Sequence, residues 1–285
     1  MANQLNWHSV WAAPAKLNLF LHVVGRREDG NHLLQTVFRF IDRADNLRFA
    51  LRDDGQIIAT CVLPGVTLEQ DLVVRAARAL KAATGIGQGV SISLNKNLPI
   101  GGGLGGGSSD AATTLIALNH LWRCRLSRDQ LKQTALTLGA DVPVFIHGHS
   151  AFGEGIGERL TDIDLPPAWY LVLVPPVAVS TVAIFSAPEL KRDSATIAVS
   201  GWRSGMGRND LEAVTCRRYP VVAKHLEWLH SLDGANFAAM SGSGACCFAE
   251  FAGESAARSA LAAVPAEMQG FVAQGLETHP LFTLT

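Results

Sequence analysis

A glycine-rich segment carries the strongest chemical signal in this sequence. Six of the seven residues from Gly101 to Gly107 are glycine, and only Leu104 interrupts them. Glycine loses more conformational entropy on folding than other residues, so this density indicates a loop whose backbone approaches another group closely. A stripe of apolar residues at the spacing of one helix face follows: Ala111, Leu115, Leu118 and Trp122. The free N–H groups and the dipole at the start of this predicted helix favour an anion, above all a phosphate.

Two better-known phosphate loops share part of this pattern. A Walker A loop needs G-x-x-x-x-G-K-[ST], and no Lys stands before Ser108 or Ser109, so that class is excluded. The dinucleotide pattern G-x-G-x-x-G is met by Gly101, Gly103 and Gly106, but a run of glycines satisfies it almost by default. The run also follows several predicted strands of antiparallel character, which disfavours a dehydrogenase.

Two other places carry polar side chains that could act on a bound phosphate. Lys16, Asn18 and His22 share one face of an alternating segment at residues 16–24, which is typical of a half-buried strand. Asp141 stands in apolar surroundings two residues before a proline, which disfavours helix at the intervening valine, so we expect a turn. From the residues alone, a solvated strand face and turn or N-cap chemistry explain these side chains better than catalysis does.

The surrounding pattern mixes strands and helices. Alternating or apolar runs predict strands over residues 33–41, 47–51, 90–94, 169–174 and 177–184. Capping residues and helical spacing predict helices over residues 71–83, 127–139 and about 211–229, besides the one after the glycines. A second small-residue turn, residues 240–244, leads into an apolar strand. It fits either a tight hairpin or a second backbone approach to phosphate.

Composition limits the possible classes of protein. The 285 residues are 48% hydrophobic, enough for two domains or lobes, and the net charge of -1 argues against a broad nucleic-acid surface. The five cysteines form no C-x-x-C pair, which favours reduced thiols and a cytoplasmic protein. The N-terminus does not fit a secretory signal, and no apolar run is long enough to span a membrane.

Three motifs in order along the chain resemble those of the GHMP kinases, the superfamily of galactokinase, homoserine kinase, mevalonate kinase and phosphomevalonate kinase. They are Pro14-Ala15-Lys16-Leu17-Asn18-Leu19, the glycine-rich segment, and Ser241-Gly242-Ser243-Gly244-Ala245. The resemblance implies an α+β fold of two lobes, each a mainly antiparallel sheet with packed helices, and an active site in the cleft between them. It places an ATP-binding lobe at residues 1–155 and a substrate-binding lobe at 156–285, whose C-terminus could pack back on the first lobe.

Two further segments, Asp29-Gly30-Asn31-His32 and Leu138-Gly139-Ala140-Asp141-Val142-Pro143, are similar to one branch of this superfamily. That branch transfers the γ-phosphoryl group of ATP, with Mg²⁺, to the 2-hydroxyl of 4-diphosphocytidyl-2-C-methyl-D-erythritol in isoprenoid precursor biosynthesis. The resemblance therefore implies a small-molecule substrate, no nucleic-acid or membrane partner, and a monomer or weak homodimer. A non-catalytic sensor of nucleotide or sugar with this fold, or a kinase for another alcohol, stays open.

The resemblance also assigns roles to residues. Asp141 is the expected base and Lys16 its neighbour, whose ammonium would favour the carboxylate form and stabilise the attacking oxygen. The expected nucleotide-binding residues are Lys96, Asp71, Pro99, Gly101, Gly102, Gly103, Leu104, Gly105, Gly106, Gly107, Ser108 and Ser109. Either Ser108 or Ser109 would face Mg²⁺. The expected substrate-binding residues are Asn18, Asn31, His32, Thr181 and Phe185, with Phe185 stacking on cytosine and His32 hydrogen-bonding its edge.

Two positions depart from the family pattern. Asn31 stands where a tyrosine is common, so one side of the expected aromatic sandwich around cytosine is missing. Asp71 replaces an asparagine often found near the adenine, where a charge could weaken or rearrange the contact. Neither departure affects the expected base or the glycine-rich loop.

Overall fold

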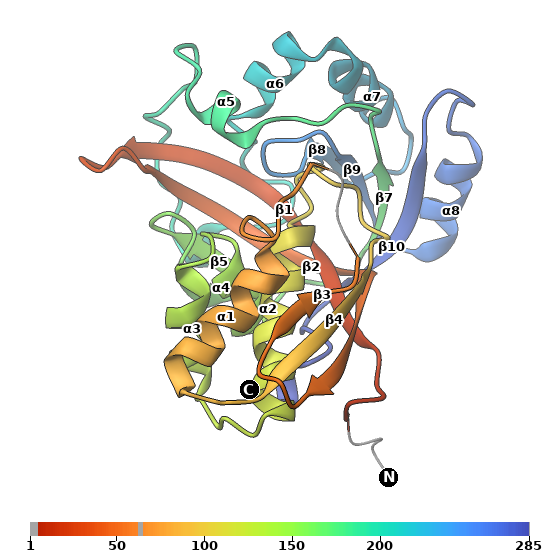
Figure 1. The fold of residues 1–285 in the computed structure, drawn as a ribbon. Coiled ribbons are helices and arrows are strands. Elements are labelled where there is room, and N and C mark those ends of the chain that lie inside the picture. The colour runs from red at the N-terminus through yellow and green to blue at the C-terminus, as the bar shows by residue number, and fades with distance from the viewer. Residues whose placement is uncertain (1–4, 62–64, 285) are drawn as a thin grey trace.

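The computed structural model describes residues 5–61 and 65–284 (Figure 1). The strands are β1 (Trp11–Arg26), β2 (His32–Arg52), β3 (Ile57–Ala59), β4 (Gly89–Asn95), β5 (Ala151–Glu154), β6 (Arg159–Asp162), β7 (Trp169–Leu173), β8 (Phe237–Met240), β9 (Cys247–Phe251) and β10 (Gly270–Leu276). The helices are α1 (Leu72–Thr84), α2 (Gly106–Leu121), α3 (Arg128–Leu136), α4 (Val142–His147), α5 (Thr181–Phe185), α6 (Glu212–Arg218), α7 (Pro220–His230) and α8 (Glu254–Ala262). Short 3-10 turns lie at Val199–Gly201 and Phe282–Leu284.

The strands form one connected sheet with the order β3-β4-β2-β10-β7-β9-β8, to which β1, β5 and β6 add beside β2. All pairs are antiparallel except β3 with β4. The two halves of the sheet join where Gly275 and Leu276 of β10 lie opposite Ile41 and Phe40 of β2. The predicted α+β class with mainly antiparallel pairing is therefore confirmed. Helices α1 to α4 gather at one end of the molecule and α5 to α7 at the other (Figure 1).

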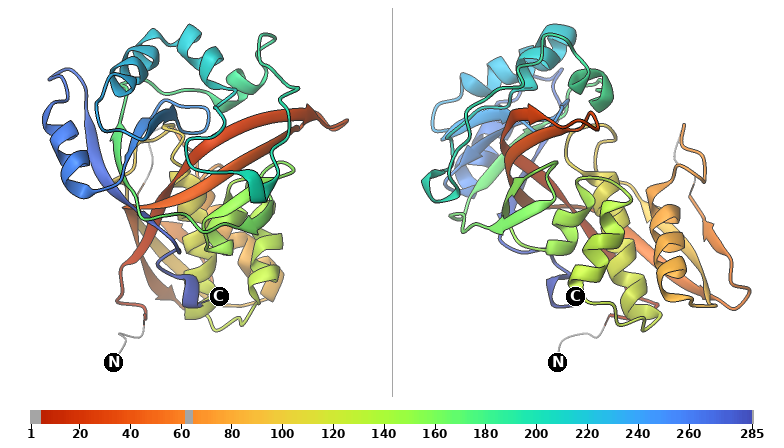
Figure 2. Two further views of the ribbon diagram at one scale, coloured as in Figure 1. Left: turned by 180° about the vertical axis from the view of Figure 1, so that it is seen from behind. Right: turned by 90° about the vertical axis from the view of Figure 1, so that its left-hand side faces the viewer.

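A long antiparallel ribbon of β1 and β2 runs through the centre, and its tip projects from the body (Figure 2). The separate strands predicted at 33–41 and 47–51 are one strand, because the residues between them pair with the start of β1 across a bulge. The solvated face predicted for β1 is wrong as well. Lys16 and Asn18 are 2% and 3% exposed. The glycine-rich segment and the turn between β8 and β9 both contact this face.

The helices of the first half begin and end close to the predicted positions. The Asp71 carboxylate accepts the Val73 N–H as N-cap of α1, and Gly85 ends that helix with φ 69°. Ser127 and Gln130 form the expected capping box of α3. Helix α2 differs: it begins inside the glycine run, and it is buried nearly all round because α1, α3, α4 and β1 surround it. The predicted apolar stripe on one face accounts for only part of the buried surface of α2.

Two predictions for the second half are wrong. The predicted strand at 177–184 is a loop followed by α5, because the Ser180 hydroxyl accepts the Ala183 N–H and so caps a helix. The single helix predicted at about 211–229 is two helices, α6 and α7. Tyr219 separates them, since Pro220 cannot continue the preceding helix and is suited to begin a new one.

Buried apolar side chains form three clusters. One lies among α1 to α4 and the adjoining strands, one under α5 to α8, and one along β1 and the junction of the half-sheets. Leu276 and Leu281 lie close to the C-terminus in sequence, yet they pack in the first cluster. We retain residues 1–155 and 156–285 as a proposed division into lobes. Within residues 5–61 and 65–284, every helix is too short or too polar to cross a bilayer.

Candidate active site

A cavity of about 880 Å³ opens between the glycine-rich segment, the middle of the β1–β2 ribbon and α5. Its volume lies within the usual range for small-molecule sites. The cavity wall includes all of the residues predicted to bind or react except Ser109: Lys16, Asn18, Asn31, His32, Asp71, Lys96, Pro99, Gly101, Gly102, Gly103, Leu104, Gly105, Gly106, Gly107, Ser108, Asp141, Thr181 and Phe185. Residues from distant parts of the sequence therefore meet in one hollow.

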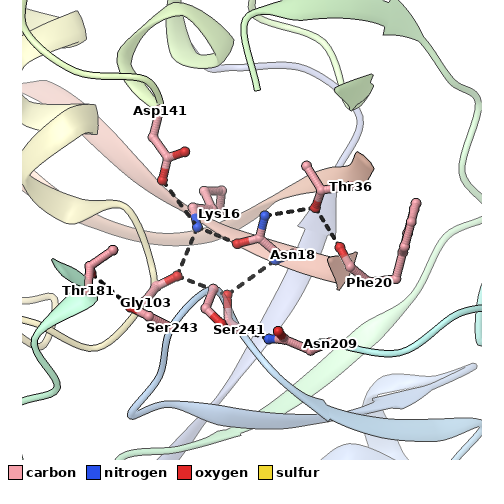
Figure 3. Close-up of polar contacts among 11 residues, drawn as sticks. Lys16, Asn18, Phe20, Thr36, Gly103, Asp141, Thr181, Asn209, Ser241 and Ser243 are labelled. Carbon is pink, nitrogen blue, oxygen red and sulfur yellow. Dashed lines mark hydrogen bonds and ion pairs between the residues drawn. The ribbon is translucent and has the colours of Figure 1, made fainter. Parts of the chain in front are cut away.

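Lys16 projects from β1 into the floor of this cavity. Its ammonium donates to Asn18 Oδ1 and to the Gly103 carbonyl at 3.0 Å, and it lies 3.5 Å from Asp141 Oδ2 (Figure 3). Asn18 is fixed in turn, because its amide donates to Thr36 Oγ1 at 2.9 Å and its backbone N–H donates to Ser241 Oγ at 3.2 Å. Two hydrogen bonds and one ion pair thus hold the Lys16 ammonium in one place.

Asp141 occupies the N-cap position of α4, but its side chain makes no capping hydrogen bond. Val142 is already helical, contrary to prediction, because a proline at the second position of a helix replaces an N–H that has no intrahelical partner. The Asp141 side chain is 41% exposed and reaches into the cavity, whereas that of Lys16 is 3% exposed. A carboxylate open to a ligand therefore faces a buried cation.

The glycine-rich loop lies against β1 through its carbonyl groups. The Gly103 oxygen accepts from Lys16 Nζ and from Ser241 Oγ at 2.9 Å, and the Leu104 oxygen accepts from the Lys16 N–H at 2.9 Å. Gly102 offers its oxygen to the Cys246 N–H at 3.0 Å. Gly103 has φ +75°, and a Cβ there would lie 2.1 Å from the backbone carbonyl oxygen of Ser241. Only glycine therefore permits this close approach.

The start of α2 has the geometry of an anion-binding helix N-terminus. Gly105 precedes the helix with φ +70°, and the N–H groups of Gly106, Gly107 and Ser108 come before the first possible intrahelical bond. Ser108 lines the cavity, whereas Ser109 is fully buried and its hydroxyl has no hydrogen-bond partner among the described residues. Of the two serines, Ser108 is therefore the one placed to meet a ligand.

Two charged residues predicted for nucleotide binding are engaged within the protein. The Asp71 carboxylate caps α1, and the Lys96 ammonium bonds to Asp45 and, at 2.8 Å, to Asp110. Burial raises the pKa of Asp110 to about 7 and outweighs the opposing effect of Lys96. The pKa of Lys96 is raised because the two carboxylates outweigh its own burial.

The other end of the cavity carries an aromatic pair. The rings of His32 and Phe185 lie 5.1 Å apart at 40°. Arg192 donates from Nε to His32 Nε2 at 3.0 Å and from Nη2 to the Phe185 carbonyl at 3.0 Å. Burial and the charges of Arg192 and Arg26 hold the pKa of His32 below its ordinary value, so the neutral ring is favoured.

Several residues that hold this site were not predicted. Asn209 donates to the carbonyls of Met240 and Gly242 at 2.8 and 2.7 Å and so fixes the turn between β8 and β9. Ser243, which lies in that turn, forms a hydrogen bond through its Oγ with Thr181 Oγ1 of α5 at 2.8 Å (Figure 3). The turn residues carried a signal, since they belong to the third motif. Arg192 lies in an irregular segment, where nothing in the sequence distinguishes it.

Comparison with known proteins agrees with this geometry. The family model "GHMP kinases N terminal domain" matches residues 71–149, and "GHMP kinases C terminal" matches residues 194–270. A protein of Dechloromonas aromatica (strain RCB), called 4-diphosphocytidyl-2-C-methyl-D-erythritol kinase, is 60% identical over 272 residues, which are 95% of this chain and 98% of its own length. This chain belongs to the GHMP kinase family. It is an ATP-dependent phosphotransferase, and its sequence falls among the 4-diphosphocytidyl-2-C-methyl-D-erythritol kinases of that family.

Further comparisons give two more relatives of this kind and one protein that shares only the fold. The protein of that name from Nitrosospira multiformis is 62% identical over 269 residues, covering 94% of this chain and 92% of its own length. A crystal structure of 4-(cytidine 5'-diphospho)-2C-methyl-D-erythritol kinase superposes with a TM-score of 0.80 at 34% identity, covering 94% of this chain and 99% of that one. A crystal structure of L. major mevalonate kinase, at 16% identity and a TM-score of 0.66 over 97% of this chain and 99% of its own, shares the fold.

Proposed function

We propose that this protein transfers the γ-phosphoryl group of ATP to the 2-hydroxyl of 4-diphosphocytidyl-2-C-methyl-D-erythritol. One arrangement carries the proposal. The Lys16–Asp141 pair lies in the same cavity as the helix start that suits ATP phosphates and the aromatic pair that suits a pyrimidine. The relatives that bear the name of this reaction match nearly the whole chain.

Phosphoryl transfer depends on in-line positioning and on neutralising charge. Asp141 accepts the proton of the attacking hydroxyl, because its carboxylate is open to the cavity and is not used as a helix cap. Lys16 stabilises the negative charge that develops on the attacking oxygen. Its ammonium is held by Asn18 and Gly103, so it needs no rearrangement during the reaction.

The nucleotide binds along the glycine-rich loop, with its phosphates at the start of α2. The free N–H groups of Gly106 to Ser108 suit anionic oxygens. Mg²⁺ prefers oxygen ligands and usually binds through substrate phosphates with few protein groups. The Ser108 hydroxyl, which lines the cavity, fits that role. Bound there with ATP, the ion would neutralise phosphate charge.

The acceptor substrate binds at the opposite end of the cavity. Phe185 stacks on the cytosine and His32 bonds to its edge, while Arg192 holds both in place. Asn31 lines the same end and offers no ring. Thr181 and Asn18 also line the cavity, where they would contact the diphosphate and the sugar alcohol.

The proposal extends to the setting of the enzyme. All five cysteines are free, as expected of a cytoplasmic protein, and we place it there. Its substrates are small molecules in the cavity, with no nucleic-acid or membrane partner, and we expect a monomer or weak homodimer.

Release of ADP tests the function. Purified protein with ATP and Mg²⁺ is given 4-diphosphocytidyl-2-C-methyl-D-erythritol, and in parallel mevalonate, homoserine or galactose. We expect ADP release only with the cytidylyl substrate. Faster release with another alcohol would transfer the protein to a different branch of the family.

A non-catalytic sensor is the remaining alternative. A sensor would bind the nucleotide or the cytidylyl compound without releasing ADP from the pair. The presence of Lys16 and Asp141 in contact favours catalysis, since a sensor needs no base. Tight binding of both ligands with no turnover would establish the sensor instead.

A further inference from the structure

Three charged residues form a buried network beneath the glycine-rich loop. Asp45 comes from β2, Lys96 follows β4, and Asp110 lies in α2. The Lys96 ammonium bonds to Oδ2 of Asp45 and, at 2.8 Å, to Oδ2 of Asp110. The two aspartate side chains are 0% and 2% exposed, and that of Lys96 is 15% exposed. Three separate elements are therefore joined by one cation.

The second oxygen of Asp45 holds the residues that enter the loop. Its Oδ1 accepts the backbone N–H of Asn97 and, at 2.8 Å, that of Leu98. The Asn97 amide also donates to the Ala44 carbonyl at 3.0 Å. Leu98 directly precedes Pro99 and the glycines, so this carboxylate fixes the point at which the loop begins.

The same network meets the end of the loop. A Cβ at Gly106, the first residue of α2, would lie 3.2 Å from Lys96 Nζ and 3.5 Å from Asp45 Oδ2. Asp110, one helical turn further along α2, is bound to Lys96. Asp45 thus contacts the loop entrance directly and, through Lys96, the helix at its exit.

The charges give this arrangement its rigidity. Two buried carboxylates would repel each other and a nearby phosphate, and Lys96 offsets part of that charge. Removing one member of a buried ionic group leaves the others uncompensated, which is strongly unfavourable. The backbone between Leu98 and Gly106 is therefore held at both ends by groups that cannot move independently.

We infer that Asp45 is a positioning residue for nucleotide binding, which fixes the glycine-rich loop in the shape that receives the ATP phosphates. It lines no part of the cavity and acts through Lys96 and the two backbone amides. This inference rests on the proposed function only in taking ATP as the ligand of the loop.

Equilibrium binding separates this role from a general loss of stability. The probe is the non-hydrolysable analogue adenylyl imidodiphosphate with Mg²⁺, and the Kd for 4-diphosphocytidyl-2-C-methyl-D-erythritol is measured in parallel. The variants are Asp45→Ala and Asp45→Asn. Asp45→Ala removes the ion pair with Lys96 and the acceptor of the two backbone amides. In Asp45→Asn the amide oxygen can still accept the Leu98 N–H. Tyr170→Phe is the matched control, because it removes a buried hydrogen bond to Glu250 away from the cavity.

We expect Asp45→Ala to raise the Kd for the ATP analogue at least about tenfold and to change that for the cytidylyl substrate less than about twofold. The Kd of Asp45→Asn for the ATP analogue should lie between those of wild type and Asp45→Ala. Tyr170→Phe should leave the Kd for each ligand unchanged. A folded Asp45→Ala protein that binds the analogue as wild type does, or loses both ligands equally, would overturn the inference. If Asp45→Ala does not fold, Asp45→Asn decides by the same comparison. A wild-type protein that does not bind the analogue would instead overturn the proposed function.

Discussion

Lys16 Nζ lies 3.5 Å from Asp141 Oδ2, and the two side chains differ sharply in exposure. The buried lysine comes from a central strand and is held by Asn18 and Gly103, whereas the aspartate stands at the start of a short helix and faces the cavity. The pair thus joins a fixed cation to an accessible carboxylate. A general base beside a stabiliser of the attacking oxygen needs this combination.

Replacing Asp141 with asparagine should separate catalysis from nucleotide binding. We expect Asp141→Asn to lower kcat by about 10² to 10⁴, the usual contribution of a general base. Binding of an ATP analogue should stay within about threefold of wild type, because the Asp141 carboxylate pairs with Lys16 and forms no hydrogen bond to the glycine-rich loop among the described residues. Steady-state kinetics and equilibrium titration measure the two effects. Equal losses of turnover and nucleotide binding would show that Asp141 has a structural role.

Restoring an aromatic ring at position 31 should strengthen binding of the cytidylyl substrate. Asn31 lines the cavity at the end that holds His32 and Phe185, and stacking on a base contributes roughly 1 to 3 kcal/mol. We expect Asn31→Tyr to lower KM for that substrate at least about fivefold, with KM for ATP unchanged. Asn31→Leu supplies apolar volume without a ring and is the control. Identical KM values for the three proteins would mean that the existing residues already compensate for the missing ring.

Arg192 should control both the protonation of His32 and the affinity for the cytidylyl substrate. Burial, Arg192 and Arg26 lower the pKa of His32. Arg192→Met should therefore raise this pKa toward its ordinary value, though burial keeps it below that value. KM for the cytidylyl substrate should rise, because His32 and Phe185 each lose a donor. Imidazole NMR titration and kinetics measure the two changes, with Arg258→Met on the remote α8 as control. An unmoved His32 pKa would contradict this electrostatic account.

His279 should make the fold sensitive to acid. Its ring is 1% exposed, packs against Phe40 and Phe145, and accepts the Leu281 N–H at 3.1 Å. Burial lowers its pKa from 6.5 to about 3, so below pH 6.5 the unfolded chain binds a proton that the folded protein excludes. The contribution of neutral His279 to the free energy of unfolding is therefore fully present above pH 6.5 and decreases as the pH falls toward 3. At pH 5 about 2 kcal/mol of it is lost.

Urea unfolding at pH 7 and pH 5 measures this effect. We expect His279→Leu to reduce the loss of unfolding free energy between the two pH values by about 2 kcal/mol relative to wild type. His8→Gln, at an exposed histidine, should leave the difference unchanged. The same acid sensitivity in wild type and His279→Leu would assign it to other groups.

Local patterns were enough to predict the close-packed glycine-rich loop and the helix that follows it. The glycine run predicts a close backbone approach, and Gly103 lies where a Cβ would overlap the Ser241 carbonyl oxygen. The caps of α1 and α3 follow from side chains that bond within their own turn. Such interactions depend on neighbours in sequence and can be predicted from it.

Contacts between distant segments could not be predicted in this way. The burial of Lys16 depends on the loop and the β8–β9 turn that cover β1, which spacing within β1 does not reveal. Thr181, Val182 and Ile184 favour a strand by their β-branched side chains, yet Ser180 caps a helix there. Arg192 reaches His32 from an irregular segment that contains no motif. The pairing of Lys16 with Asp141 was predicted from the resemblance to the GHMP kinases. The structure gives the distance of 3.5 Å between Lys16 Nζ and Asp141 Oδ2.

The position of the transferred phosphate tests the central proposal most directly. The protein is incubated with ATP, Mg²⁺ and 4-diphosphocytidyl-2-C-methyl-D-erythritol, and the products are followed by phosphorus NMR and mass spectrometry. We predict a new phosphomonoester on the 2-hydroxyl of the methylerythritol group, formed in equal amount with ADP and about 10² to 10⁴ times more slowly when Asp141 is replaced by asparagine. ADP accompanied by free inorganic phosphate, or a phosphate on any other hydroxyl, would contradict the proposed reaction.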